Sequence, residues 1–187
     1  MGPIGNSRLT ALTGSVLLVL LAAEGATLVS LSTFVSWHIF IGMLIVPVVG
    51  LKLVSTGWRF IRYYTHKEDY VRAVPPHPVL RLIGPIVVLS TAGLLASGVA
   101  LAALGPGGSF LLLLHKASFV VWLGALGIHV LGHILRLPSL ATPDVRDAPL
   151  AWGARIRLAL VGSTILVGTA IAVATLPLTH AWSHVVH

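Results

Sequence analysis

The stretch Leu111–Leu135, LLLLHKASFVVWLGALGIHVLGHIL, decides the fold of this 187-residue chain. It is apolar apart from Lys116, Ser118 and three histidines, and it is long enough to cross the hydrocarbon core of a membrane as one helix. His115 and His129 are separated by almost four helical turns, so both imidazoles point to nearly the same side, about 21 Å apart along the helix axis. Because histidines inside a membrane are costly, this pair indicates a functional role.

The rest of the chain has the same apolar character. It is 56% hydrophobic and only 9% charged, with a mean hydropathy of +0.97, as is typical of integral membrane proteins. The apolar runs are continuous and not alternating, which favours helices over the strands of a barrel. We therefore predict an all-α integral membrane bundle that forms a single domain over residues 1–187. Its five transmembrane helices are expected at about residues 10–32, 36–62, 79–104, 110–136 and 154–177.

The net charge of +7 is explained by membrane topology and does not call for a nucleic-acid partner. Most of the twelve Lys and Arg residues flank two connections, between the second and third helices and between the fourth and fifth. Arg8 precedes the first helix, and only Lys116 lies near the opposite ends. The positive-inside rule places the N-terminus and both long loops in the cytoplasm and the C-terminus outside. We expect the first apolar segment to be a retained helix and not a cleaved signal peptide.

The chain has no cysteine, which excludes disulfides, iron–sulfur clusters, thiolate metal sites and covalent c-type haem attachment. Histidine is then the remaining strong ligand for a transition metal inside the bundle, and neutral imidazole is a usual axial ligand of b-type haem. The histidines should therefore be compared by their depth in the membrane.

His38 lies a few residues inside the outer end of the second helix, and His115 lies at a matching depth in the fourth. Two histidines from different helices at one depth are what bis-histidine haem ligation needs, because the ligands approach the iron from opposite faces. Gly42, one turn from His38, is expected to leave room for a porphyrin edge. Lys116 is expected to pair with a haem propionate, which would explain the single basic residue at the outer side.

A second haem at the inner side has less certain ligands. His129 lies on the same helix face as His115. His133, one turn further along, is almost in line with His115 and is an alternative to His129 as the inner ligand. A symmetric four-histidine cytochrome would have another histidine fourteen residues after His38, where this chain has Lys52. The partner must come from elsewhere, and His77, before the third helix, is the best candidate.

Two further polar groups are candidates for the site. Glu24 is an acid inside the first apolar run, and an intramembrane carboxylate suggests proton or quinone handling; the alternative is a hydrogen bond between helices. Arg59 is a candidate for an inner-haem propionate, although the topology rule alone also accounts for it. The histidines of the C-terminal tail, His180, His184 and His187, are interpreted as a frayed end and not as a metal site.

With His115 and His129 on one helix and His38 opening an earlier one, the chain resembles the small b-type cytochromes of the cytochrome b561-like superfamily. These include the cytochrome b subunits of formate dehydrogenases and hydrogenases and the ferric-reductase-like membrane domains. In the dehydrogenase-type subunits one helix likewise supplies two histidines. The stretch 51–64 also looks like that of actinobacterial cytochrome b-like membrane proteins, which implies a bacterial cell membrane. The resemblance covers about residues 36–136 and departs from the ferric-reductase pattern at Lys52.

The expected function is that of a membrane b-type cytochrome. It would transfer electrons between a quinone or a cytoplasmic reductant and an outer-face partner protein through one or two b haems. The chain has no nucleotide-binding fingerprint, so it would act as a relay or as a subunit of an oxidoreductase, and self-association is left open. One alternative is a proton- or metal-ion-coupled transporter that uses the histidines and Glu24. Another is an anchor that recruits a soluble enzyme through its basic loops.

Overall fold

The computed structural model describes residues 2–71, 78–134, 137–147 and 151–183, and within these ranges all regular structure is helical. The long helices are α1 (Pro3–Thr27), α2 (Leu31–Tyr64), α4 (Pro78–Leu104), α5 (Ser109–Leu131) and α7 (Trp152–Ala174). Shorter elements connect or follow them: η1 (Leu28–Ser30), α3 (Glu68–Val71), α6 (Leu137–Asp147), η3 (Leu176–Thr179) and α8 (His180–Ser183).

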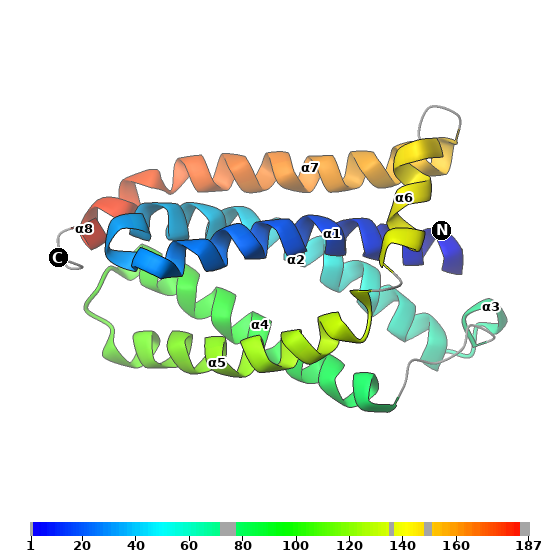
Figure 1. The fold of residues 1–187 in the computed structure, drawn as a ribbon, viewed down its shortest axis with the longest axis horizontal. Helices are drawn as coiled ribbons and strands as arrows, with labels where there is room; N and C mark the ends of the chain where they lie inside the picture. Colours follow the sequence, from blue (N-terminus) through cyan, green and yellow to red (C-terminus); the bar gives the residue numbers. More distant parts are fainter. Residues whose placement is uncertain (1, 72–77, 135–136, 148–150, 184–187) are drawn as a thin grey trace.

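Helix α2 lies at the centre of the bundle (Figure 1), with α1 and α7 packed along it and α4 touching it more briefly. Helices α4 and α5 form a hairpin, and α5 packs chiefly against α4. The buried core runs along α1, α2 and α7, through clusters that include Leu17, Ile45 and Val48, and Ala102 of α4 joins it near one end. The hairpin is therefore attached to the three-helix core mainly through α4.

Four helical segments are long and apolar enough to cross a membrane: Pro3–Tyr64, Leu82–Leu104, Ser109–Leu131 and Trp152–Ala174. The first is a 62-residue stretch that comprises α1, η1 and α2. Because α1 and α2 pack side by side, the stretch turns back on itself at η1 (Figure 1). Large apolar side chains such as Leu89, Leu113 and Leu166 are exposed on the outside of the bundle, as a lipid-facing surface requires.

Two connections differ from the sequence-based expectation. The first turn was predicted at residues 32–36; the chain begins to reverse earlier, at η1, and the predicted stretch contains the kink at Phe34, where two helical segments of α2 meet at a non-helical residue. The connection after the fourth helix was predicted as a loop over residues 137–153, but residues 137–147 form α6. By contrast, the short connection expected between about residues 104 and 110 is present, and Gly105 there has a φ of +79°, which glycine adopts without strain.

The close packing of α7 on α2 depends on one glycine. At Gly168 a Cβ atom would lie 3.2 Å from the carbonyl carbon and from Cα of Leu44, and still closer to the Leu44 carbonyl oxygen. Small residues at such crossings let two helix backbones approach in a membrane, where packing and not water exclusion holds helices together. Gly168 thereby fixes the position of α2, the helix that carries His38.

Candidate functional site

The structure brings His38 of α2 and His115 of α5 together. Their ring centroids lie 6.4 Å apart and the ring planes are perpendicular, at 90°. Metal–imidazole bonds are about 2 Å long, so two imidazoles on opposite sides of one ion have ring centres about 6 Å apart. Because α5 packs chiefly on α4, the two rings reach toward each other from helices that are not closely packed neighbours. The spacing is thus suited to one metal centre between the rings.

The ring of His115 is held in one tautomer by helix α4. Its Nδ1 lies 3.0 Å from the backbone carbonyl oxygen of Leu94 and 3.2 Å from Oγ of Ser97. A carbonyl oxygen can only accept, so Nδ1–H donates to Leu94. In the neutral imidazole the lone pair is then on Nε2, the nitrogen that remains available for a metal. Metal-binding histidines usually have their second nitrogen fixed in this way.

The ring of His38 is held in the same tautomer by helix α1. Its Nδ1 lies 3.0 Å from Oγ1 of Thr27 and 3.1 Å from Oε1 of Glu24. The Thr27 hydroxyl donates its own proton to the backbone carbonyl of Glu24, at 2.5 Å, so its oxygen accepts from His38. Nδ1 of His38 is therefore the protonated nitrogen, and among the described residues neither His38 nor His115 makes a hydrogen bond through Nε2.

Two glycines lie beside these rings. At Gly42 the nearest atom to an added Cβ is Oε1 of Glu24, at 3.4 Å, which is an ordinary van der Waals contact; Gly42 therefore faces the carboxyl group of Glu24, and its expected role beside a porphyrin edge stays a prediction. Gly98 of α4 lies against His115, because an added Cβ would be 3.0 Å from its Cε1. Gly98 therefore leaves the space that the His115 ring occupies.

Lys116 is exposed next to His115, at the start of α5. This position leaves its side chain available to a charged group at the membrane surface, and its proposed pairing with a propionate stays a prediction. Helices α2 and α5 both begin at the end of the bundle where α7 ends (Figure 1), so the His38–His115 pair lies near one surface of the predicted membrane.

At the other end of α5 the histidines are arranged differently. His129 and His133 stack on each other, with ring centroids 4.7 Å apart and planes inclined by 25°. Nδ1 of His133 donates to the backbone carbonyl of His129, at 3.0 Å, whereas Nδ1 of His129 is buried and has no hydrogen-bond partner in the described part of the chain. Two stacked rings on one helix cannot approach an iron from opposite sides, so only one of them can be a haem ligand here.

The expected partners of the inner histidines are not brought to them by the described residues. His77 lies outside the described ranges. Lys52, in the place of the missing histidine, donates from Nζ to the backbone carbonyl of Thr10 on α1, at 2.7 Å. Arg59 is directed toward α1 as well, where its Nη1 lies 3.5 Å from Oγ of Ser7. An inner haem therefore has one candidate ligand on α5, either His129 or His133, and no second ligand among these residues.

A charged cluster at the same end was not found from the sequence. Asp144 of α6 is fully buried and receives two hydrogen bonds from the guanidinium of Arg157 on α7, one of them 2.6 Å long from Nη2. Arg8 of α1 adds a further contact at 3.4 Å. The hydrogen bonds from Arg157 hold the pKa of the Asp144 carboxyl below its usual range. An arginine inside a predicted span, in a chain with only five acids, could have indicated this pair.

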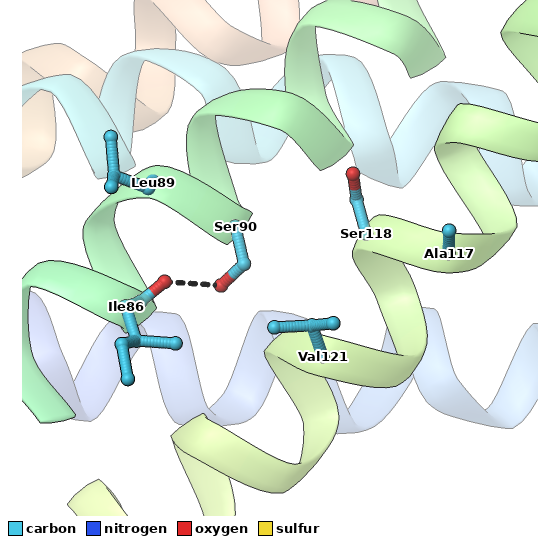
Figure 2. Close-up of a pocket in the computed structure, with 6 residues that line it drawn as sticks. All are labelled: Ile86, Leu89, Ser90, Ala117, Ser118 and Val121. Atoms are coloured by element: carbon cyan, nitrogen blue, oxygen red, sulfur yellow. Dashed lines mark hydrogen bonds between the residues drawn. The ribbon is translucent and has the colours of Figure 1, made fainter.

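A groove of about 380 Å³ between α4 and α5 is lined by Ile86, Leu89, Ser90, Ala117, Ser118 and Val121 (Figure 2). Its lining is apolar except for two serines, and the Ser90 hydroxyl donates to the carbonyl of Ile86 in its own helix, at 2.7 Å. The groove therefore has no titratable or metal-binding side chain, and His38 with His115 remains the site best equipped for chemistry.

Comparison with protein-family models, with curated proteins and with solved structures finds no match for this chain. The geometry of the side chains is consequently the basis for the functional assignment.

Proposed function

We propose that the protein is a membrane b-type cytochrome in which His38 and His115 are the axial ligands of one haem. A bound haem would supply reversible one-electron transfer. The observation that carries the proposal is the perpendicular ring pair at 6.4 Å, with the Nδ1 atom of each ring engaged and each Nε2 left for a metal.

The donor set fits haem better than it fits a bare metal ion. Among the described residues no group of three or more His, Cys, Asp or Glu side chains could hold an ion. A porphyrin itself provides four nitrogen ligands, so only two protein ligands are needed, and both are present here as imidazoles. This also weighs against the metal-transporter alternative, which requires a fuller set of protein ligands along its path.

The chain's own residues would hold and shield the cofactor. Helix α1 orients His38 through Thr27 and Glu24, and helix α4 orients His115 through Leu94. The surrounding apolar helices keep water from the site, and burial and the partners of the ligands tune the reduction potential of haem. Electrons would pass between a quinone or a cytoplasmic reductant and a redox partner protein at the outer face, in a bacterial cell membrane.

A visible spectrum of the purified protein with and without dithionite tests the proposal. We expect sharp reduced α and Soret bands in the wild type, and their loss in His38→Ala and in His115→Ala. His66→Asn is the matched control, because His66 is an exposed histidine at a φ of +52°, a conformation that asparagine tolerates. A colourless wild type that takes up no added haem would contradict the proposal, as would full bands in both alanine variants.

The proposed five-span topology, with the N-terminus in the cytoplasm, is tested by labelling single cysteines, because the chain has none of its own. Cysteines at Gly2 and Asp69 are expected to react on the cytoplasmic side of right-side-out vesicles only after the membrane is opened. Cysteines at Gly107 and Ala181 are expected to react from outside. If the cysteines at positions 2 and 69 were on opposite sides, α1 and α2 would not both cross the membrane.

A further inference from the structure

Helix α1 supplies two oxygen atoms that lie next to the same nitrogen of His38. Oγ1 of Thr27 and Oε1 of Glu24 lie 3.0 Å and 3.1 Å from Nδ1. Thr27 is buried, and only 17% of the Glu24 side chain is exposed. The carboxyl group is not a general feature of a membrane helix, since an acid inside a span is costly unless it has a partner.

The burial of the Glu24 carboxyl group is energetically unfavourable. Its second oxygen, Oε2, is buried and makes no hydrogen bond in the described part of the chain. A buried polar atom without a partner is destabilising. This feature points to a carboxyl group kept for the contact that its other oxygen, Oε1, makes with His38.

The two proposed ligands differ in what orients them. His115 donates to a backbone carbonyl of α4, which no substitution removes. His38 depends on two side chains of α1, which substitutions can remove. Isolated imidazole has no such preference for a proton on Nδ1, and the tautomer is set by the hydrogen bond that one nitrogen makes. Without Thr27 and Glu24, nothing described here would keep the proton on Nδ1 of His38.

We infer that Glu24 and Thr27 are positioning residues that hold His38 as the Nδ1–H tautomer and keep its Nε2 available as an axial ligand. The role of Nε2 as an axial ligand rests on the proposed haem function, whereas the tautomer of His38 is a property of the protein without haem. A carboxyl group behind a ligating histidine also raises the basicity of the ligand. This gives Glu24 a role distinct from proton or quinone handling.

The test compares variants that keep or remove the accepting oxygens. Glu24→Gln and Thr27→Ser each keep an acceptor and should retain the wild-type tautomer. The double variant Glu24→Leu with Thr27→Val removes both accepting oxygens. If this variant does not fold, Glu24→Met with Thr27→Val removes the same oxygens and places an unbranched side chain at position 24. In haem-free protein with ¹⁵N-labelled histidine, NMR is expected to show His38 as Nδ1–H in the wild type and loss of that form in the double variant.

The haem-loaded proteins give the second readout. The double variant is expected to keep haem on His115 but to lose the low-spin spectrum of two histidine ligands and to gain carbon monoxide binding, whereas Glu24→Gln keeps the low-spin spectrum. An unchanged tautomer together with an unchanged spectrum in the double variant would overturn the inference. A wild type that binds no haem would instead overturn the proposed function, and the NMR result would still decide whether Glu24 and Thr27 set the tautomer.

Discussion

Replacing Gly168 by alanine is expected to destabilise the bundle, because the added methyl group would collide with the backbone of α2. The new Cβ would lie 3.2 Å from the carbonyl carbon and Cα of Leu44, and closer still to the carbonyl oxygen. Favourable carbon–carbon contacts begin at about 3.5 Å. A backbone cannot rotate away as the end of a side chain can, so α7 and α2 must move apart. Overpacking of this kind costs about 1–3 kcal/mol.

Gly162→Ala is the matched control on the same helix, since no heavy atom lies within 4 Å of a Cβ there. Alanine is favoured over glycine in a helix by about 1 kcal/mol, so this variant should be as stable as the wild type or more stable. Thermal unfolding in detergent, followed by tryptophan fluorescence, measures both. We expect Gly168→Ala to melt about 2–12 °C below the wild type. Equal melting temperatures for the two variants would refute the close approach of α7 to α2.

Three further outcomes are expected. Asp144→Asn should destabilise the protein by about 3–5 kcal/mol, because it leaves the guanidinium of Arg157 buried without its counter-charge. The pKa of the Asp144 carboxyl is lower in the folded protein than in the unfolded chain, so the carboxylate stabilises the fold above about pH 4. This stabilisation is lost as the pH falls through the pKa of the folded state. The loss of stability in acid should therefore be shallower in Asp144→Asn. Gly98→Ala should displace the ring of His115 and alter the reduced spectrum, whereas Gly84→Ala on the same helix, with nothing within 4 Å of its Cβ, should not. A pyridine haemochrome assay is expected to give one haem per chain, because the described residues supply one complete ligand pair. Two haems in the wild type, falling to one in a variant with both His129→Ala and His133→Ala, would instead show that the inner site binds haem.

The helical fold and the meeting of His38 with His115 were accessible from the sequence for a simple physical reason. Membrane thickness sets the length of a span, and the helical rise converts residue number into depth. Two histidines a few residues from the same membrane surface must then lie at similar heights. Apolar length could locate the turn between the first two helices only to within a few residues, because residues 28–36 contain no charge, glycine or proline to mark it.

The rotation of each helix about its axis was harder to predict. In a membrane both faces of a helix are apolar, so the periodicity that identifies the buried face of a soluble helix is weak. This is why the carboxyl group of Glu24 opposite Gly42 and the partners of the two Nδ1 atoms were not foreseen. Helix α6 was missed because its sequence contains two prolines and polar residues that are typical of loops.

The two ends of α5 show why one haem site is better supported than two. At one end the histidines come from different helices, so their rings can lie on opposite sides of a metal. At the other end both come from α5 and stack on each other. Position 52 of α2, where a symmetric cytochrome would place a histidine, instead carries a lysine that ties α2 to the Thr10 carbonyl of α1. That side chain serves helix packing, so a second haem requires a ligand from beyond α2, and the segment that contains His77 is where mutagenesis should look for it.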